Sequence, residues 1–457
     1  MPYIPHTEED VKTMLSSMSL SDVDSLFDEI PSELRCKDFQ SIPDSSNEMQ
    51  MLQHAAALAS QNNNGICFLG AGAYEHHIPA AVWDIATRGE YLTAYTPYQA
   101  EASQGTLQLL YEYQTMMAEL TAMEVSNASL YDGASALAEA VLMAARLQKN
   151  IESHRVLVPA SLHPLYRETL DTILRNQHIE LITLPFDDKT GVTSLGALKQ
   201  YEHQTITALV IPQPNFFGCL EPVDELSDWA KAHNIISIGC VNPMSLALLK
   251  PPGEWGSYGV DIACGEGQPL GVPLASGGPY FGFLTTKMAH VRQMPGRLIG
   301  QTVDAAGKRG FALTLQAREQ HIRRAKATSN ICTNQGLLVT AATIYMSLLG
   351  PAGLASVAKA CWANTQKLVQ ALTSIDGVTL AFESANFHEC VLTLIKPVPF
   401  VLEALSKRGI TGGYALTADY PNIKNGLLVC ATELRTGAEI DAYRDALAQI
   451  LHEGVPS

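Results

Sequence analysis

Short apolar runs recur at a regular interval through the middle of the chain. Four such runs, each bounded by proline, glycine or polar residues, begin at Arg155, Leu181, Ala208 and Ile235. The interval of 26 or 27 residues leaves room for one helix between consecutive strands, and helical patterns occupy Tyr166–Arg175 and Val223–His233. Strands that alternate with helices are typical of a parallel sheet. We therefore predict an α/β domain with a mainly parallel sheet, to which Pro279–Leu284 adds a further strand.

The pattern changes after Met288. Residues Arg292–Arg324 are basic and polar, and Gly336–Leu349 has a helical spacing that Gly350-Pro351 ends. Short strands follow at Val378–Phe382, Cys390–Leu394 and Gly426–Cys430, and helices at Phe400–Lys407 and Gly437–His452. We predict a large α/β domain at residues 61–325 and a small α+β domain at residues 326–457.

Residues 1–60 have the pattern of an N-terminal helical arm. Thr7–Leu15 and Ser21–Phe27 are short amphipathic segments that begin with a good capping residue, so both are predicted as helices. Arms of this kind usually wrap around a neighbouring subunit. A longer helix is predicted at Ser103–Met123 in the large domain, with Ser103 as its cap.

Composition and charge exclude several classes of function. With 46 acidic and 30 basic residues the net charge is −16, which provides no electrostatic basis for binding nucleic acid or an anionic membrane. No stretch reaches the roughly 20 apolar residues of a membrane span, and Met1–Leu15 resembles neither a secretory signal nor a transit peptide. The nine cysteines occur singly, so their spacing indicates neither a metal site nor a disulfide framework. We expect a soluble, cytoplasmic protein.

Ligands of open α/β sheets bind beyond the carboxyl ends of the strands. Two segments with such potential are rich in small residues. Ser129–Ala136 leads into an alanine-rich helix, and its N–H groups suit either a phosphate or an ordinary helix start capped by Asp132 or Ser135. Ala263–Pro279 holds five glycines and three prolines and is predicted as an irregular loop, either structural or ligand-binding.

A third segment, Ala94–Gln99, places polar tips around a fixed turn at Pro97. Its candidate lining residues are Tyr95, Thr96, Tyr98 and Gln99. Rigid aromatic rings with polar ends suit a pocket or an interface. A packed turn explains the same residues, so both interpretations stay open.

Five segments together resemble the amino-terminal-half subunit of the P-protein of the glycine cleavage system. They are residues 68–79 (FLGAGAYEHHIP), 95–99 (YTPYQ), 129–133 (SLYDG), 318–324 (REQHIRR) and 326–333 (KATSNICT). The resemblance implies a large domain like that of fold-type I pyridoxal-phosphate (PLP) transferases, with a C-terminal small domain. It also implies the family's reaction, in which glycine loses its carboxylate as CO2 and its aminomethyl group passes to the lipoyl arm of H-protein, with PLP as electron sink.

Two positions depart from what PLP chemistry needs, namely a lysine for the Schiff base and an acid for the pyridinium nitrogen. By comparison with the family's lysine-bearing subunit, the lysine position falls on Gln268 and the acid position on Gly239, and no lysine lies between Lys250 and Lys287. The resemblance implies that PLP is bound by a partner, the PLP-bearing P-protein subunit 2, and that this chain binds no cofactor. From the cysteine spacing we also expect no metal site. We expect the partner to be a separate chain, in a heterodimer or a heterotetramer.

Further residues have two interpretations each. His163 follows the Val156–Val158 strand, where the partner family places a ring over the cofactor; it is a relic of that site or a hydrogen-bonded histidine in the turn before Pro164. A set of bases suits substrate or lipoyl recognition, or alternatively a solvated or interface face. These bases are Arg318, Arg323, Arg324 and Lys326.

Two hypotheses about function follow. In the first, the chain is an obligate enzyme subunit that completes the partner's active site through Tyr95, Tyr98 and Gln99, with glycine and lipoylated H-protein as substrates. In the second, it is a non-catalytic scaffold of the same assembly, and Tyr98→Phe or Gln99→Ala leaves turnover unchanged. A minor third alternative is a self-sufficient PLP enzyme that uses Lys287 or Lys326.

Overall fold

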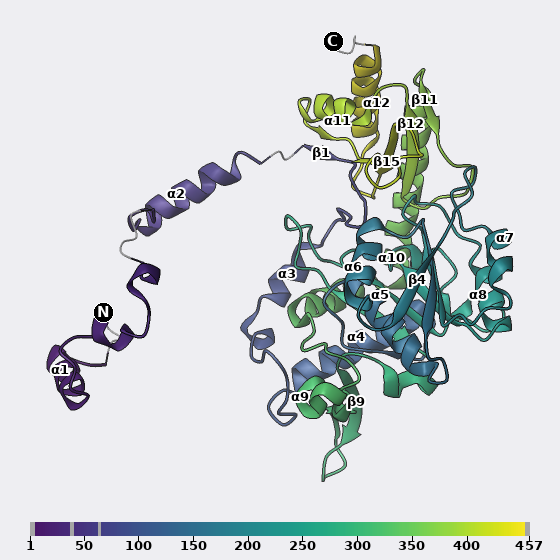
Figure 1. Ribbon diagram of the computed structural model, residues 1–457. Helices are drawn as coiled ribbons and strands as arrows, with labels where there is room; N and C mark the ends of the chain where they lie inside the picture. Colours follow the sequence, from purple (N-terminus) through teal and green to yellow (C-terminus); the bar gives the residue numbers. More distant parts are fainter. Residues whose placement is uncertain (1–4, 37–40, 63–64, 453–457) are drawn as a thin grey trace. The chain divides into compact units, whose positions relative to one another are not determined.

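The computed structural model describes residues 5–36, 41–62 and 65–452. Contacts divide the chain into two units, Met1–Asn63 and Asn64–Ser457. The first unit contains the helices α1 (Glu8–Ser17) and α2 (Glu48–Ala59), which Figure 1 shows in purple. Both begin with a capping box, in which the side chains of the cap residue and of the residue three positions later each accept a backbone N–H of the other.

The predicted arm helices are confirmed in part. Thr7 caps α1, since its hydroxyl accepts the N–H of Asp10 at 3.2 Å. The segment Ser21–Phe27 is not a helix over its length: only Asp24–Phe27 turns, as a 3-10 helix, and the Ser21 hydroxyl bonds to its neighbour Asp22 instead of capping a helix.

A seven-stranded sheet forms the centre of the second unit (Figure 1). Its order is β2 (Val125–Ser126), β8 (Gly282–Thr286), β7 (Ile262–Glu266), β6 (Ile236–Val241), β5 (Ala208–Gln213), β3 (His154–Pro159) and β4 (Ile179–Leu184). The pairs among β7, β6, β5, β3 and β4 are parallel, whereas β8 and β2 pair antiparallel. The predicted mainly parallel sheet is confirmed, but residues 263–266, predicted as loop, form most of β7.

Helices cover both faces of this sheet. Side chains alternate between faces along a strand, so Val156 and Val158 join the core beneath α5 (Gly133–Leu147) and α6 (Pro164–Leu174), while Leu157 joins the core on the opposite face. The opposite face is covered by α4 (Gln104–Thr121), α8 (Val223–Ala232) and α10 (Gly336–Thr373). This arrangement leaves the two ends of the strands as the accessible edges of the sheet.

The helix α10 bends where the sequence predicts a break. Gly350 has a φ of +59°, which is accessible to glycine, and Pro351 follows it. Within the described part of the chain, α10 is the one helix long and apolar enough to cross a membrane by length and composition, and half of its most apolar window is buried in the fold. Leu338 lies in the core of the large sheet and Leu372 in the core of the small sheet, so α10 behaves as a core helix.

A four-stranded antiparallel sheet forms the C-terminal part, in the order β11 (Val378–Leu380), β12 (Glu389–Leu394), β15 (Gly426–Cys430) and β14 (Tyr414–Ala415). It packs with α11 (Val398–Ser406) and α12 (Gly437–His452), as predicted. The chain enters this unit at β1 (Ile66–Cys67), which pairs with β13 (Ile410–Thr411). The proposed division at residue 325 stays a prediction.

Further elements complete the second unit. They are the helices α3 (Ala80–Ala86), α7 (Leu195–Leu198) and α9 (Gln320–Arg323) and the antiparallel pair β9 (Leu298–Val303) and β10 (Arg309–Thr314). Six of the nine cysteines are buried in the fold.

Candidate functional site

The carboxyl ends of the parallel strands lie together at one end of the large sheet and enclose a small cavity of about 80 Å³. We call it the strand-edge cavity. Four of the five parallel strands contribute a polar residue at or just beyond their ends. These are His163 after β3, Asn215 after β5, Asn242 after β6 and Glu266 at the end of β7. A cavity therefore lies beyond the strand ends, where a ligand site was expected, but it is small.

Residues 68–79, which we call the covering segment, help to close the cavity. Ala71 N–H and the Tyr74 hydroxyl donate to the two carboxylate oxygens of Glu389, on β12, at 2.7 and 2.8 Å. Gly72 faces His163 so closely that a Cβ at this glycine would lie 2.7 Å from the imidazole Nε2. The covering segment is thus held by the small sheet and lies against the strand ends.

Gln268 forms hydrogen bonds with the covering segment. It is almost fully buried. Its Oε1 accepts the N–H of Tyr74 at 2.8 Å, and its Nε2 donates to the carbonyls of Tyr74 and Val272, each at 2.8 Å. The amide therefore uses its donors and its acceptor to hold two backbone segments together.

Gly239 lies within β6, packed against a tryptophan. A Cβ built at this position would lie 3.1 Å from the Trp255 ring and 3.3 Å from Pro252. The indole of Trp255 is fully buried. Any side chain at position 239 would press into this packing.

The N-terminus of α5 confirms the helix-cap interpretation of Ser129–Ala136. Asp132 Oδ1 accepts the N–H of Ser135 at 2.7 Å, and the Ser135 hydroxyl accepts the N–H of Asp132 at 3.1 Å. Gly133 N–H donates to the carboxylate of Glu266 at 2.9 Å. These backbone donors, which would suit a phosphate, are already engaged by side-chain acceptors.

Burial changes the titration of the groups around the cavity. It raises the pKa of Glu266 to about 8 and that of Glu389 to about 7, because a charged carboxylate is disfavoured in an apolar environment. Burial also lowers the pKa of His163. The Nε2 of His163 donates to the Ala71 carbonyl at 3.0 Å and its Nδ1 accepts the Leu165 N–H at 3.2 Å, an arrangement that needs the neutral ring.

The predicted tyrosine segment lies elsewhere on the surface. Tyr95, Tyr98 and Gln99 are exposed, Thr96 is half-buried, and none of them lines the strand-edge cavity. We call these four residues the tyrosine surface. Tyr95 borders a separate hollow of about 410 Å³, with Gln335 among its other lining residues. The structure therefore does not bring Tyr95, Thr96, Tyr98 and Gln99 together with His163, Gln268 or Gly239.

Arg297 and His321 hold Tyr98 in place. Its ring meets the His321 ring edge-on with centroids 5.6 Å apart, and the Arg297 guanidinium stands 5.9 Å from its centre. Arg297 is itself almost fully buried and donates to Asn334 Oδ1 at 2.8 Å. A polar, partly immobilised ring is thereby presented to the outside.

Motifs distant in sequence meet beside this surface. The Tyr131 hydroxyl accepts the N–H of Cys332 at 2.8 Å, and the Ser129 hydroxyl accepts the N–H of Gln335 at 3.1 Å. Segments 129–133 and 326–333 are therefore in contact, and Arg297 connects the second of them to Tyr98. Spacing along the chain gave no sign that these motifs form one region.

The basic residues separate into a structural arginine and a surface group. Arg318 is buried and donates to the carbonyls of Leu315, Met294 and Gly296; burial lowers its pKa. Arg323, Arg324 and Lys326 are exposed. The interpretation of the whole run as one solvated or binding face is wrong for Arg318, because backbone carbonyls occupy its guanidinium.

The lysines proposed for a self-sufficient enzyme lie away from the cavity. Lys287 follows Thr286, which pairs with Ile262 at the start of β7, so it stands at the opposite edge of the sheet and pairs with Asp261 at 3.0 Å. Lys326 is exposed. Neither residue lines the strand-edge cavity.

Comparison with known proteins gives a consistent result. The family model described as glycine cleavage system P-protein matches residues 1–447. Proteins named probable glycine dehydrogenase (decarboxylating) subunit 1 are 67% identical over 451 residues in Legionella pneumophila (strain Corby), covering 99% of each chain, and 60% identical in Thioalkalivibrio sulfidiphilus, covering 99% of this chain and 100% of the relative.

Solved structures extend this likeness to three dimensions. A crystal structure of glycine decarboxylase (P-protein) of the glycine cleavage system, in inhibitor-bound form, has a TM-score of 0.87 at 42% identity and covers 98% of this chain and 100% of its own. A sphingosine-1-phosphate lyase of Burkholderia pseudomallei has a TM-score of 0.66 at 16% identity, covering 90% of this chain and 92% of its own, and shares the fold alone. The predicted fold class, that of fold-type I PLP enzymes, is confirmed.

Proposed function

The chain belongs to the glycine cleavage system P-protein family and is a subunit of its glycine decarboxylase; we propose that it holds no PLP of its own and completes the active site of a PLP-bearing partner. The observation that carries this proposal is the state of the two proposed cofactor positions: the Gln268 amide is hydrogen-bonded to backbone groups, and Gly239 packs against Trp255. The assembly catalyses the decarboxylation of glycine, with transfer of the aminomethyl group to the lipoyl group of H-protein.

The residues at the strand edge do not fit PLP. A Schiff base needs a lysine amine, and Gln268 instead gives its amide to backbone groups of Tyr74 and Val272. An acid at position 239 would place its Cβ 3.1 Å from the Trp255 ring, so the ring would have to shift. The cavity of about 80 Å³ is also far smaller than the roughly 300 Å³ at which small-molecule pockets begin. We therefore derive no chemical step from this cavity.

The tyrosine surface supports the second part of the proposal. Tyr95 and Tyr98 are 86% and 53% exposed. Large aromatic side chains are seldom this exposed on a protein that acts alone. Tyr98 is nevertheless positioned by Arg297 and His321. A hydroxyl held in place and turned outward suits orientation of a substrate and exclusion of water in a site that another subunit completes.

A partner subunit follows from the names of the relatives, which call them subunit 1. We propose that this partner is the lysine-bearing P-protein subunit 2, that the assembly is a heterodimer or a heterotetramer, and that glycine and lipoylated H-protein are its substrates. The cytoplasm is the proposed compartment. The scaffold alternative differs from this proposal in one respect, since it assigns no role to the tyrosine surface.

The test is glycine–bicarbonate exchange in the presence of PLP and lipoylated H-protein. Labelled bicarbonate enters the glycine carboxylate only when the decarboxylation is reversible on the enzyme. We expect exchange with the mixture of this chain and its partner, and none with either chain alone. Exchange by this chain alone would refute the absence of a cofactor site, and full exchange by the partner alone would reduce this chain to a scaffold.

A further inference from the structure

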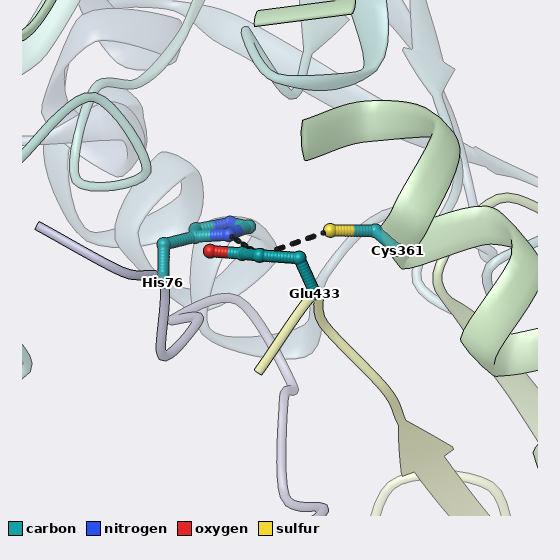
Figure 2. A group of neighbouring side chains, drawn as sticks. All are labelled: His76, Cys361 and Glu433. Carbon is teal, nitrogen blue, oxygen red and sulfur yellow. Dashed lines mark hydrogen bonds and ion pairs between the residues drawn. The ribbon is translucent and has the colours of Figure 1, made fainter. Parts of the chain in front are cut away.

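Three side chains from distant parts of the sequence converge at the far end of the covering segment. They are His76 of that segment, Cys361 of α10 and Glu433, which follows β15 (Figure 2). The imidazole Nδ1 lies 2.8 Å from Glu433 Oε2, and the Cys361 thiol lies 3.2 Å from the same oxygen. One ligand atom from each side chain lies within 4.8 Å of the other two.

This group is buried, and its polar atoms are incompletely satisfied. Cys361 is fully buried, His76 is 8% exposed and the Glu433 side chain is 12% exposed. Among the described residues, His76 Nε2 has no hydrogen-bond partner, and neither has the hydroxyl of the fully buried Tyr345. Unpartnered buried polar atoms are rare in folded proteins, so these two atoms mark an incompletely satisfied polar region.

We propose that His76, Cys361 and Glu433 bind a divalent cation of the zinc class. An imidazole nitrogen, a thiolate and a carboxylate are the three ligand types that Zn²⁺ takes from proteins. A thiolate in the set disfavours Mg²⁺ and Ca²⁺, which prefer oxygen. Water supplies the fourth ligand, and Glu433, the least buried of the three, marks the side from which it enters.

Binding of an ion requires the side chains to adjust. Tetrahedral zinc with ordinary bond lengths separates its ligand atoms by about 3.3–3.5 Å. His76 Nδ1 and Cys361 Sγ now lie 2.8 and 3.2 Å from Glu433 Oε2, and all three ligand atoms lie within 4.8 Å of one another, so the ion would replace the two hydrogen bonds to Glu433. The second carboxylate oxygen of Glu433 is already fixed by the His77 N–H at 2.6 Å, which provides the outer support that metal ligands usually have.

Proton balance gives the binding reaction a signature. A cysteine binds zinc as the thiolate. Binding of the cation therefore forms a metal–sulfur bond and releases the thiol proton to solvent.

Occupation of the site would join three segments. His76 belongs to the covering segment, Cys361 to the half of α10 after its bend, and Glu433 to the C-terminal part. The ion would therefore lock the covering segment to the small sheet, independently of any role in decarboxylation. A cysteine, a histidine and a glutamate at such separations in sequence match no metal-binding spacing, which is why the sequence alone indicated no metal site.

The experiment is a titration of the chelator-stripped full chain with Co²⁺, followed by competition with Zn²⁺. We expect one equivalent of Co²⁺ to produce a thiolate-to-cobalt charge-transfer band, release of protons and a raised thermal midpoint, and Zn²⁺ to abolish the band. Cys361→Ser should remove the band and weaken Zn²⁺ binding by at least about 100-fold, the upper end of the effect of losing an outer partner of a ligand.

A cysteine outside the group provides the control variant. Cys332→Ser, which removes an exposed thiol, should leave the band and the affinity unchanged. If Cys361→Ser fails to fold, the wild-type titration still decides, because a hydrogen-bonded cluster without a metal function gives neither the charge-transfer band nor proton release. Absence of a stoichiometric band in the wild-type chain, or its persistence in folded Cys361→Ser, would overturn the proposal.

Discussion

Gln268 and Tyr74 exchange two hydrogen bonds, each of 2.8 Å: the backbone N–H of Tyr74 donates to Gln268 Oε1, and Gln268 Nε2 donates to the Tyr74 carbonyl. Gln268, which we propose stands at the lysine position of the family, thus connects the covering segment to the chain just after β7. The Tyr74 hydroxyl continues the connection to Glu389 of the small sheet. Gln268 and Tyr74 therefore connect the end of β7, the covering segment and the small sheet in one hydrogen-bonded arrangement.

Gln268→Lys should destabilise the chain without giving it a cofactor. A lysine can donate but cannot accept, so the Tyr74 N–H loses its partner, and a charge enters a nearly water-free site. We expect the free energy of unfolding to fall by about 2–4 kcal/mol, measured by denaturant titration. After incubation with PLP we expect no imine absorbance.

The matched control for this substitution is Gln200→Lys, at an exposed position. It should change the free energy of unfolding by no more than about 0.5 kcal/mol. The contrary result is a stable Gln268→Lys chain that binds PLP covalently, seen as an imine absorbance and a stable adduct after borohydride reduction. It would show that this chain can still hold the cofactor.

Gly239→Asp should also be destabilising, for a steric reason. The new Cβ would lie 3.1 Å from Trp255, and the carboxylate would have to desolvate beside an indole. Overpacking and a buried charge together predict a loss of about 3 kcal/mol or more. Gly239→Ala isolates the packing part and should lose less. Equal effects of the two variants in thermal unfolding would show that the charge is not buried.

The raised pKa of Glu389 predicts a pH dependence of stability. The folded state holds a proton that the unfolded chain releases above about pH 4.5, so the stabilisation from this group is complete below that pH and is lost as the pH rises through about 7. Glu389→Gln imitates the protonated form and removes this loss. Between pH 5 and pH 8 the variant should gain up to roughly 3 kcal/mol relative to the wild type.

Chemical denaturation at several pH values measures this difference. Glu383→Gln, an exposed carboxylate close in sequence, should give a difference that stays flat over the same range. A flat profile for Glu389→Gln as well would mean that the carboxyl group is charged in the folded chain at neutral pH.

The strand sequence was predictable because buried parallel strands are continuous apolar runs. Three of the five parallel strands, β3, β5 and β6, are mostly buried in this way, and β4, at the edge of the sheet, is apolar at four of its six positions. The fifth, β7, reads Ile-Ala-Cys-Gly-Glu and continues into glycines and prolines, so its composition resembled a loop. Its strand character depends on pairing with β6 and β8 on both sides, which is tertiary information that local sequence does not contain.

The cavity and its covering segment were not predictable from the sequence for a related reason. Tyr74 meets Gln268 across 194 positions and Glu389 across 315. The family resemblance pointed to Gln268 and Gly239. Only the fold shows that Gln268 hydrogen-bonds to the covering segment and that Gly239 leaves space for the Trp255 ring. Glu389 and Tyr74 carry no local signal that distinguishes them from ordinary core residues.

Tyr98→Phe separates a contributing subunit from a scaffold. Among the described residues the Tyr98 hydroxyl has no hydrogen-bond partner, and the side chain is 53% exposed; removing the oxygen should therefore leave the stability of this chain unchanged. If the hydroxyl positions substrate in a site completed by the partner, exchange by the mixed enzyme should fall by about 10- to 100-fold, and Gln99→Ala should act in the same direction.

Tyr258→Phe, at a tyrosine 65% exposed and outside the tyrosine surface, serves as control and should keep full activity. Unchanged turnover in both Tyr98→Phe and Gln99→Ala, with the assembly intact, would favour the scaffold, because a surface that only presents an interface does not depend on one outward-facing oxygen.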